Sequence, residues 1–348
     1  MIRVWRHGAH SHRMPVAYPA LAPLFEGRIA HVDRPEAADL HLFAHVLDIA
    51  AAPREMVEDW RRRRRPVVLL SEEPFWDTIW GRRPLDRIRP VETAYGALPV
   101  IQLNHATSPI FAFDRIPYYL LTNHRFATAY RARFTANAGL SPADWRRRFA
   151  ARAVDTAFMF ERRPEPYHGM AWPGAGLFGL CAWRTELAEA MAGPGTERLG
   201  QSWQGGRTRF ELANWHLDKL VDLDGRARIL AGLENTHHPD YLTEKIFDAF
   251  ACGSLPLYLA EPRHRLHELA LPEGSWLNLA GLSPEAAADR VRSVTWEPAR
   301  FEAFAEAQAV LARLFSDTGL WVAERHRLGT AVVTALDEVL EDRPAPVG

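Results

Sequence analysis

The chain has 348 residues, of which 47% are hydrophobic and 24% charged, so it is long enough for one large domain or for two. Its formal net charge of −1 excludes a global field that would recruit nucleic acid, and its two cysteines exclude a disulfide framework. No apolar run approaches membrane-span length and the N-terminus lacks the apolar core of a signal peptide, so we expect a cytoplasmic protein without a transmembrane segment.

The first half of the chain alternates short apolar strands with helical stretches. A helix is predicted around 53–64, and strands are predicted at 2–6, 40–46, 66–71 and 99–103. Short, nearly continuous apolar strands that alternate with helices are typical of a parallel sheet covered on both faces. The sequence therefore predicts an α/β domain in this half.

A run of five arginines, Arg61–Arg65, lies at the end of the helix predicted around 53–64. Cations suit the C-terminal end of a helix dipole, so we interpret the run mainly as a solvated face of the helix. The alternative is a peripheral contact with an anionic membrane surface or an anionic acceptor.

Two local signals divide the chain. Ser141 and Asp144 form a capping-box pattern that begins a helix over 141–152. The segment 162–176 is rich in proline and glycine, and we interpret it as the linker between two domains. The expected domains are 1–165 and 166–348.

The second half repeats the α/β pattern. A compact βαβ unit, which is right-handed in nearly all proteins, is formed by strand 228–234, helix 243–252 and strand 255–260. A helix at about 183–192 precedes this unit, and a strand and three helices follow it, at 276–279, 283–294, about 297–315 and about 319–341. The simplest assembly is two Rossmann-like domains that face each other across a cleft.

Lysine is almost absent from the chain. Every basic side chain is arginine except Lys219 and Lys245. Lys245 lies in the first turn of the helix predicted at 243–252, where the helix dipole disfavours a cation. A cation at that end makes physical sense if an anion docks there, so the position indicates a phosphate-bearing ligand.

Further polar side chains lie between the carboxyl end of strand 228–234 and this helix start, where open parallel sheets bind ligands. They are Glu234, Asn235, Tyr241, Thr243 and Glu244. Asparagine and glutamate suit ribose or sugar hydroxyls, and the tyrosine could stack or donate a hydrogen bond. The alternative is that Thr243 and Glu244 only cap the helix while Lys245 is solvated.

The segment ENTHHPDYLTEKIFDAFACGSLPLY resembles the signature of the α-1,3/1,4-fucosyltransferases, glycosyltransferase family ten. The ten-residue step from Glu234 to Glu244 matches the family pattern, as do Tyr241, Thr243, Lys245, Pro256 and Tyr258. The resemblance implies that this segment binds the guanosine diphosphate and the fucose of GDP-fucose. It also implies the GT-B architecture of two Rossmann-like domains.

Two departures from the family pattern lie close to this segment. Leu233 stands where the family has phenylalanine, and Leu259–Ala260 replace a Trp-Gly pair after Pro-Leu-Tyr. These changes alter the bulk near the pocket wall and leave room for a different donor sugar or acceptor.

Arg184 is a second candidate for the diphosphate. The stretch GLCAWRTELAEAM resembles the place where the family has an arginine at a helix start, which implies a pyrophosphate-binding role for Arg184. A guanidinium there can form two hydrogen bonds to phosphate oxygens, whereas the alternative is an ordinary surface arginine. Lys219 and Arg228 also fall at basic positions of the pattern, without an assigned role.

The first half resembles the family only in fragments. VVLLSEEP ends a predicted strand, as does the family segment that carries the proposed catalytic base, so Glu72 is the candidate general base and Glu73 its competitor. Successive strand residues point to opposite sides, so only one of them is expected to face the cleft. The alternative is two solvated acids at the start of a loop.

Two other features would indicate a different kind of site, a dinucleotide-binding loop or a metal centre. Gly174, Gly176 and Gly179 satisfy the GxGxxG pattern of dinucleotide-binding loops, but they follow a loop rather than a strand. The histidines form no HExxH or Cys–His set, so neither a metal nor another cofactor is expected.

We therefore expect an inverting glycosyltransferase that moves fucose, or a related sugar, from a GDP-sugar to a hydroxyl of an oligosaccharide, lipopolysaccharide or other glycoconjugate. The alternatives are the same fold with another nucleotide-sugar donor, a nucleotide-sugar-binding protein without turnover, and a dinucleotide oxidoreductase.

Overall fold

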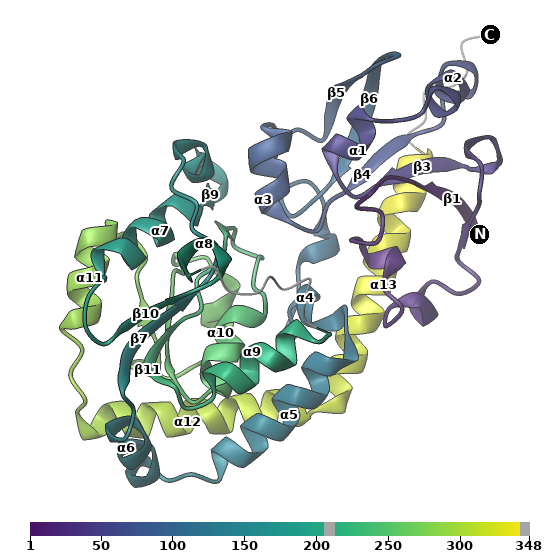
Figure 1. Ribbon diagram of the computed structural model, residues 1–348. Helices are drawn as coiled ribbons and strands as arrows, with labels where there is room; N and C mark the ends of the chain where they lie inside the picture. Colours follow the sequence, from purple (N-terminus) through teal and green to yellow (C-terminus); the bar gives the residue numbers. More distant parts are fainter. Residues whose placement is uncertain (205–212, 342–348) are drawn as a thin grey trace. The chain divides into compact units, whose positions relative to one another are not determined.

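The computed structural model describes residues 1–204 and 213–341, which form two compact units (Figure 1). Unit 1 contains Met1–His124 together with Gly319–Gly348, and unit 2 contains Arg125–Thr318. Each unit has its own parallel sheet, so the expected α/β class with two Rossmann-like domains is confirmed. The expectation that the two domains face each other across a cleft stays a prediction.

The sheet of unit 1 has six strands in the order β2-β1-β3-β4-β6-β5. Five run parallel, and β5 pairs antiparallel with β6. Their bounds are β1 Ile2–Arg6, β2 Ile29–His31, β3 Leu40–Phe43, β4 Val67–Leu70, β5 Ile88–Thr93 and β6 Gly96–Leu103. Every residue of β3 and β4 is buried, because central parallel strands are covered on both faces.

Short helices surround this sheet, and one long helix returns to it from the end of the chain. They are α1 Val46–Ala50, α2 Arg54–Arg63, α3 Pro74–Trp76, α4 Tyr118–Leu121 and α13 Thr318–Glu341. Glu324 of α13 is 3% exposed and accepts hydrogen bonds from the backbone nitrogens of Asp114 and Arg115. These contacts attach the C-terminal helix to unit 1 instead of to the expected domain 166–348.

The sheet of unit 2 has five parallel strands in the order β10-β7-β11-β13-β14. Their bounds are β7 Val154–Met159, β10 Thr196–Leu199, β11 Ala227–Ala231, β13 Leu255–Tyr258 and β14 Leu277–Asn278. Because β7 is the central partner of β10 and β11, residues before 165 already belong to the second sheet. The expected division at 165/166 is therefore not where the units separate.

The segment 162–176, expected to be a linker, lies inside unit 2. It contains β8 (Ala171–Trp172), which pairs with β9 (Leu177–Gly179) in a small antiparallel sheet completed by β12 (Thr236–His237). Proline and glycine serve here as the turn residues of this small sheet, a local role that composition alone does not distinguish from a linker.

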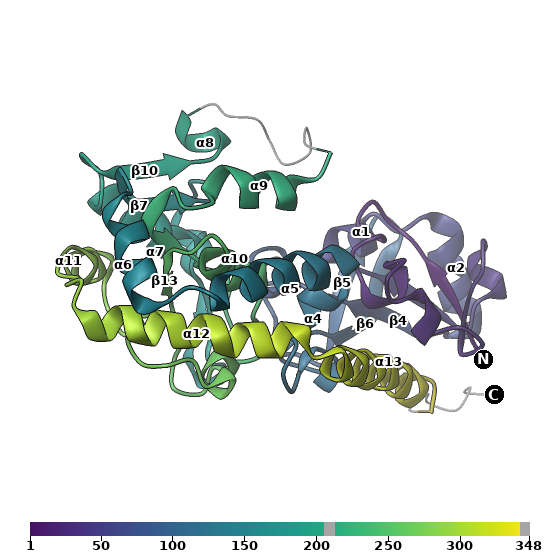
Figure 2. The ribbon, with the colours of Figure 1, turned by 90° about the horizontal axis from the view of Figure 1, so that it is seen from below.

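Helices cover the second sheet. They are α5 His124–Ala138, α6 Pro142–Ala150, α7 Cys181–Ala190, α8 Gln201–Gln204, α9 Trp215–Leu223, α10 Glu244–Ala251, α11 Pro284–Arg292 and α12 Pro298–Ser316. The predicted capping box of Ser141 and Asp144 is confirmed at the start of α6. Figure 2 shows α5 and α12 side by side, and Phe134 stacks on Phe315 between them with ring centroids 5.2 Å apart.

The arginine run at the end of α2 is largely engaged within unit 1. Arg63 forms an ion pair of 2.6 Å with the buried Asp59, Arg61 donates to the carbonyl oxygen of Tyr95, and the Arg64 guanidinium lies 4.4 Å from the centroid of a tryptophan ring. The helix end was predicted correctly, but these side chains are more than a solvated face.

A buried carboxylate ties three helices of unit 2 together. Asp248 of α10 is fully buried and accepts hydrogen bonds from Tyr130 of α5 at 2.7 Å and from His216 of α9 at 2.8 Å. Lys219 of α9 completes its shell with an ion pair of 2.7 Å. Burial opposes the charge of Asp248, but Lys219 and His216 outweigh it and hold its pKa at about 2. This places Lys219 in the structural core of the unit.

Replacement of Lys219 by methionine is expected to lower the free energy of unfolding by about 3–5 kcal/mol, because it leaves a buried carboxylate without its cation. Urea denaturation at pH 7 measures this loss. The matched control is Arg226→Met, whose pair with Glu197 is 42% and 29% exposed, and which is expected to cost less than about 1 kcal/mol. An unfolding free energy of Lys219→Met equal to that of the control would contradict the assignment.

Candidate functional site

The order in which the chain adds strands to the sheet of unit 2 reverses at β7, because β10 lies on one side of β7 and β11 on the other. In open parallel sheets, ligands bind beyond the carboxyl ends of the strands at this switch point. The chain leaves β11 towards Glu234 and then enters α10. Gly232 allows the end of β11 and the helix α10 to pack closely, because a Cβ atom at this position would lie 2.9 Å from the Cα of Ile246 in α10.

Glu234 is the centre of this site, and it is 2% exposed. Its Oε1 accepts hydrogen bonds from the backbone nitrogen of Thr243 at 2.9 Å and from the Thr243 hydroxyl at 2.7 Å. Thr243 is the N-cap residue of α10, as predicted, but its hydroxyl does not cap the helix. It is directed to Glu234 instead, so the site rather than the helix determines its orientation.

Lys245 is not solvated, which excludes the alternative that it is an ordinary surface cation. Its Nζ lies 2.8 Å from Glu234 Oε2, 2.8 Å from the Thr243 hydroxyl and 3.5 Å from Glu244 Oε1. Burial disfavours its charge, but the two carboxylates outweigh burial and raise its pKa. One quarter of the side chain is exposed.

The two carboxylates respond differently to their surroundings. Burial is the largest influence on Glu234 and raises its pKa, with Lys245 opposing the shift. Burial also acts against the charge on Glu244, but Lys245 and Lys219 outweigh it, so its pKa is lowered. Glu234 is therefore the group in this site that takes up a proton more readily.

Arg184 belongs to the same site. It lies in the first turn of α7, it is 5% exposed, and its guanidinium donates to the carbonyl oxygen of Leu233 at 3.2 Å. Its planar group lies 4.6 Å from the ring centroid of Phe160, which follows β7. The structure thus brings Arg184, at the helix start where it was predicted, to the carboxyl ends of β7 and β11, and its pyrophosphate-binding role stays a prediction.

Asn235 and Tyr241 complete the predicted set. The backbone carbonyl of Asn235 accepts a hydrogen bond from Leu180 at the start of α7, and Tyr241 closes a turn in which its nitrogen donates to the carbonyl of His238 at 3.0 Å. Tyr241 is 5% exposed.

Several buried polar atoms of this site have no hydrogen-bond partner among the described residues. They are Asn235 Oδ1, Glu244 Oε2 and Arg184 Nε. A buried polar atom without a partner costs about 1–3 kcal/mol, so a group of them is uncommon unless a ligand satisfies them. Both donors and acceptors are present, as a molecule with phosphates and hydroxyls requires.

The acidic pair of unit 1 follows β4 and is not solvated, contrary to one of the two interpretations. Glu72 is 2% exposed, and its oxygens accept from Arg13 Nε at 2.9 Å, Tyr118 at 2.7 Å and Tyr18 at 2.8 Å. Burial raises the pKa of both tyrosines, so their hydroxyls stay protonated donors. Glu72 is therefore a fixed and fully hydrogen-bonded carboxylate.

Glu73 has a different environment. Its side chain is 15% exposed, and it forms an ion pair with Arg13, the same arginine that binds Glu72. We expected only one of the two acids to face the cleft, but both turn to Arg13. Glu73 lies beyond β4 as the N-cap of α3, where the alternation of a strand no longer applies.

Sequence reasoning missed the partners of this acidic pair and a neighbouring histidine. His10, which follows β1, has its ring nitrogen Nδ1 3.0 Å from Asp48 of α1, and its ring is 5.4 Å from that of Trp76. A Cβ atom on Gly8, which has a φ of +103°, would collide with Asp48. The one sequence signal was the stretch RHGAHSHR after the first strand, but only the strand order shows that it lies beside α1.

Asp77 was also missed, although it lies four residues after Glu73. It is 4% exposed, and burial raises its pKa to about 7, with Arg89 opposing the shift and Glu73 adding to it. A carboxyl group beside the acidic pair therefore titrates close to neutral pH.

The GxGxxG pattern does not form a dinucleotide-binding loop. Gly174 and Gly176 lie in and after a short 3-10 turn that follows the antiparallel β8, and Gly179 ends β9. Within residues 1–204 and 213–341, no three His, Cys, Asp or Glu side chains are grouped as metal ligands. In the same residues no helix is both long enough and apolar enough to cross a membrane.

Comparison with known proteins identifies one part of the chain. Residues 209–312 match the model of the C-terminal domain of glycosyltransferase family 10 (fucosyltransferase), and no curated protein matches the chain. The match contains every predicted donor residue from Glu234 to Lys245, so the resemblance stated for this segment is confirmed. Arg184, Glu72 and Glu73 lie outside the matched residues, and their roles stay predictions.

Two solved structures are similar to the chain as a whole. One is described as an alpha1,3-fucosyltransferase, with 13% identity and a TM-score of 0.40. The other is an alpha1,3-fucosyltransferase with GDP-fucose, with 13% identity and a TM-score of 0.41. Both matches cover 99% of this chain and 91% of the other.

Asp77 is expected to make stability depend on pH. Because its pKa is raised from 3.8 to about 7, the folded chain binds this proton more tightly than the unfolded chain, so the contribution of Asp77 to stability is greatest below pH 4 and falls as the pH rises to 7. Asp77→Asn keeps the neutral shape and removes this decline, a difference of at most about 4 kcal/mol. Urea denaturation from pH 4 to 8 measures it. The control is Asp86→Asn, 35% exposed, and equal pH profiles for Asp77→Asn and the wild type would disprove the raised pKa.

Proposed function

We propose that the chain transfers fucose from GDP-fucose to a hydroxyl of a glycan, since residues 209–312 match the C-terminal domain of glycosyltransferase family 10 (fucosyltransferase). In this proposal the configuration at the sugar carbon is inverted and a carboxylate of unit 1 is the general base. The residues of unit 2 bind the nucleotide sugar.

The observation that carries the proposal is the convergence of Arg184, Lys245 and the start of α10 at one switch point. Glu234 and Glu244 balance these two cations when all four groups are ionised. Protonation of Glu234, whose pKa is raised, would give the site a net charge of +1, which favours a diphosphate. The unsatisfied oxygens of Glu244 and Asn235 suit the hydroxyls of a ribose or a sugar.

The same arrangement suits the chemistry of transfer. When the bond between the sugar carbon and the diphosphate breaks, negative charge grows on the leaving GDP. Fixed positive groups placed where this charge develops stabilise the transition state more than the ground state. Lys245 and the helix start are fixed by Glu234 and Thr243, and Arg184 is fixed by the carbonyl of Leu233.

Of the two candidate bases, the structure favours Glu73. Glu72 already accepts three strong hydrogen bonds, so an acceptor hydroxyl would have to displace one of them. Glu73 is more exposed and shares Arg13 with Glu72, so Glu72 would orient the arginine that positions the base. A general base contributes about 10²–10⁴ in rate.

The donor class is tested by ligand-induced thermal shifts of the purified chain. GDP and GDP-fucose are expected to raise the melting temperature more than UDP-sugars, CMP-sugars or NAD, because a ligand that binds only the folded state stabilises it. A larger shift with NAD would favour an oxidoreductase, and a larger shift with another nucleotide sugar would favour a different donor.

Lys245→Ala is expected to weaken GDP binding by about 10–100-fold, the equivalent of one charge-assisted hydrogen bond, and to abolish transfer. Isothermal titration with GDP measures the affinity. The matched control is Arg290→Ala, an exposed cation of α11, which should bind GDP like the wild type. Because the variant also leaves Glu234 without its cation, circular dichroism must show that unit 2 is folded. Near-normal turnover of Lys245→Ala would contradict the proposal.

The two acids are distinguished by Glu73→Gln and Glu72→Gln. We expect Glu73→Gln to lower kcat by at least about 100-fold, with the melting temperature unchanged, because only the proton acceptor is lost. Glu72→Gln is expected to lower stability as well as activity, because Arg13, only 18% exposed, loses a charged partner. A fully active Glu73→Gln and an inactive but stable Glu72→Gln would assign the base to Glu72.

A further inference from the structure

Residues 80–88 of unit 1, here called the edge segment, combine exposed apolar side chains with arginines. Trp80 is 42% exposed, Leu85 43% and Ile88 63%. Single apolar residues at a surface are ordinary, but several of them within one short segment indicate a place that another molecule covers. The segment joins the helical turn Asp77–Gly81 to β5, the outermost strand of the sheet of unit 1.

The backbone of the edge segment is held by two buried amides at the end of β6, so its exposure is not that of a loose loop. The side chain of Gln102, which is fully buried, donates to the carbonyl oxygens of Arg83 at 2.9 Å and of Asp86. The side chain of Asn104, which is 1% exposed, donates at 3.0 Å to the carbonyl oxygen of the residue after Arg83. Because the nitrogen of Asp86 donates to the carbonyl oxygen of Arg83 at 3.4 Å, the chain turns here and Leu85 occupies a corner of the turn.

Trp80 presents one part of its ring to the protein and the rest to solvent. The inner part packs against His45 and Phe75, with ring centroids 5.2 Å and 5.6 Å away. Leu47 of α1, which is 47% exposed, donates from its backbone nitrogen to His45 Nδ1 at 3.1 Å. Trp80 and Leu47 are thus neighbours of the same histidine, and the exposed apolar surface extends from the edge segment to the start of α1.

The charge of the edge segment is positive. It contains Arg82, Arg83 and Arg87, against a single acidic residue, Asp86. Asp86 pairs with Arg83 at 2.6 Å, whereas Arg82 is exposed and forms no ion pair in the described part of the chain. The surface therefore offers cations to an anionic partner beside its apolar side chains.

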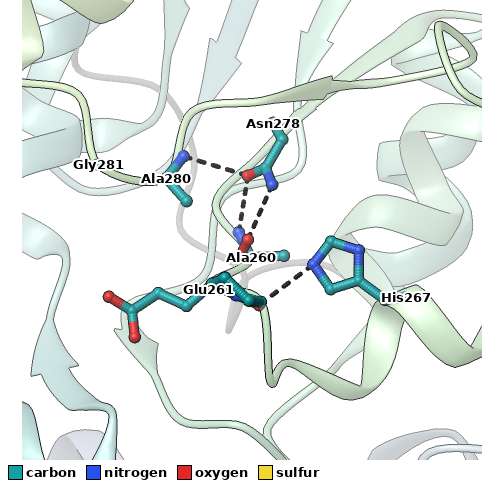
Figure 3. Close-up of a pocket in the computed structure, with 7 residues that line it drawn as sticks. Ala260, Glu261, His267, Asn278, Ala280 and Gly281 are labelled. Atoms are coloured by element: carbon teal, nitrogen blue, oxygen red, sulfur yellow. Dashed lines mark hydrogen bonds between the residues drawn. The ribbon is translucent and has the colours of Figure 1, made fainter.

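The shape of the edge segment limits the kind of partner that it fits. Small molecules bind in concave sites, such as the cavity of about 600 Å³ that lies beyond β13 and β14 in unit 2 (Figure 3). The wall of that cavity is formed at the ends of two neighbouring strands, where Asn278 binds the backbone of Ala260 and Ala280. A turn with an exposed leucine at its corner suits instead a partner into which the turn can insert.

A lipid bilayer with anionic headgroups matches each of these side chains. Leucine inserts below the headgroups, tryptophan prefers the boundary between headgroups and hydrocarbon, and arginine binds the anionic headgroups. From this combination we infer that the edge segment docks unit 1 on an anionic membrane surface, with Trp80 and Leu85 as the apolar contacts and Arg82 and Arg83 as the cationic ones. The inference goes beyond the proposed function and does not depend on it.

This surface is not the one that the arginine run suggested. Arg61 of the run Arg61–Arg65 donates to the carbonyl oxygen of Tyr95, in the turn that follows β5. The edge segment precedes β5, which begins at Ile88. The two groups of arginines therefore lie at opposite ends of this strand, and variants of each distinguish the two surfaces.

Co-sedimentation of the full chain with lipid vesicles tests the docking. The wild type is expected to bind phosphatidylcholine vesicles that contain about 30% phosphatidylserine at least about 10-fold more tightly than pure phosphatidylcholine vesicles. Replacement of Arg82 and Arg83 together by alanine is expected to weaken binding by about 10-fold or more, and Leu85→Ser by about five-fold or more. All three side chains are exposed, so the melting temperature of both variants should equal that of the wild type.

The matched controls are the replacement of Arg62 and Arg64 together by alanine, and Leu217→Ser on α9, which is 50% exposed. Both should bind vesicles like the wild type. Equal losses in the control and edge-segment variants, or equal binding of the wild type to the two kinds of vesicle, would overturn the inference.

Sedimentation velocity without lipid covers the other occupant of this surface, a second copy of the chain. The docking inference fails if the wild type is a dimer that binds no vesicles and Leu85→Ser converts it to a monomer. A chain that binds GDP-fucose but no vesicles would keep the proposed function and lose the docking.

Discussion

The ion pair between Glu234 and Lys245 is the interaction on which the proposed donor site depends. It connects the end of β11 to the first turn of α10, and the absence of a side chain at Gly232 makes the approach possible. A cation at a helix start is unfavourable alone, and a carboxylate that is 2% exposed is unfavourable alone, but each compensates the other. A diphosphate that approaches Lys245 competes with Glu234. Since burial raises the pKa of Glu234, protonation of this carboxylate and binding of the anion favour one another.

Much of unit 2 could be predicted because its signals are local. The βαβ unit from β11 to β13, the N-cap position of Thr243 and the capping box at Ser141 all depend on residues that are close in sequence. The proposed donor residues could also be named from the sequence, since Glu234 and Lys245 lie at two ends of one loop. What the sequence did not reveal is that the Thr243 hydroxyl and the Lys245 ammonium turn towards Glu234. That orientation depends on burial, which has no local signature.

The parts that were missed depend on contacts between distant residues. Arg13, Tyr18 and Tyr118 meet Glu72 from as far as 59 residues away, and the approach of Arg13 is possible because only β3 separates β1 from β4 in the sheet. The C-terminal helix α13 was assigned to the second domain by its place in the sequence, whereas its Glu324 binds the backbone of Asp114 more than 200 residues earlier. Turn residues in 162–176 imitate a linker because proline and glycine serve both purposes.

The two lysines of an otherwise arginine-only chain have a common explanation in α10. Glu244 and Asp248 lie one turn apart on this helix, and two buried carboxylates at that spacing repel each other. Lys245 compensates the charge of Glu244 and Lys219 compensates the charge of Asp248, and both lysines lower the pKa of Glu244. Each ammonium fits into a narrow space between acceptors, and Lys245 has three acceptors for its three donors. A planar guanidinium has a wider and fixed geometry, so arginine suits the exposed pairs of this chain better than these buried positions. The two lysines thus compensate the charge of one buried helix face, and Lys245, whose side chain is 25% exposed against 14% for Lys219, is the one that lies beside unsatisfied polar atoms.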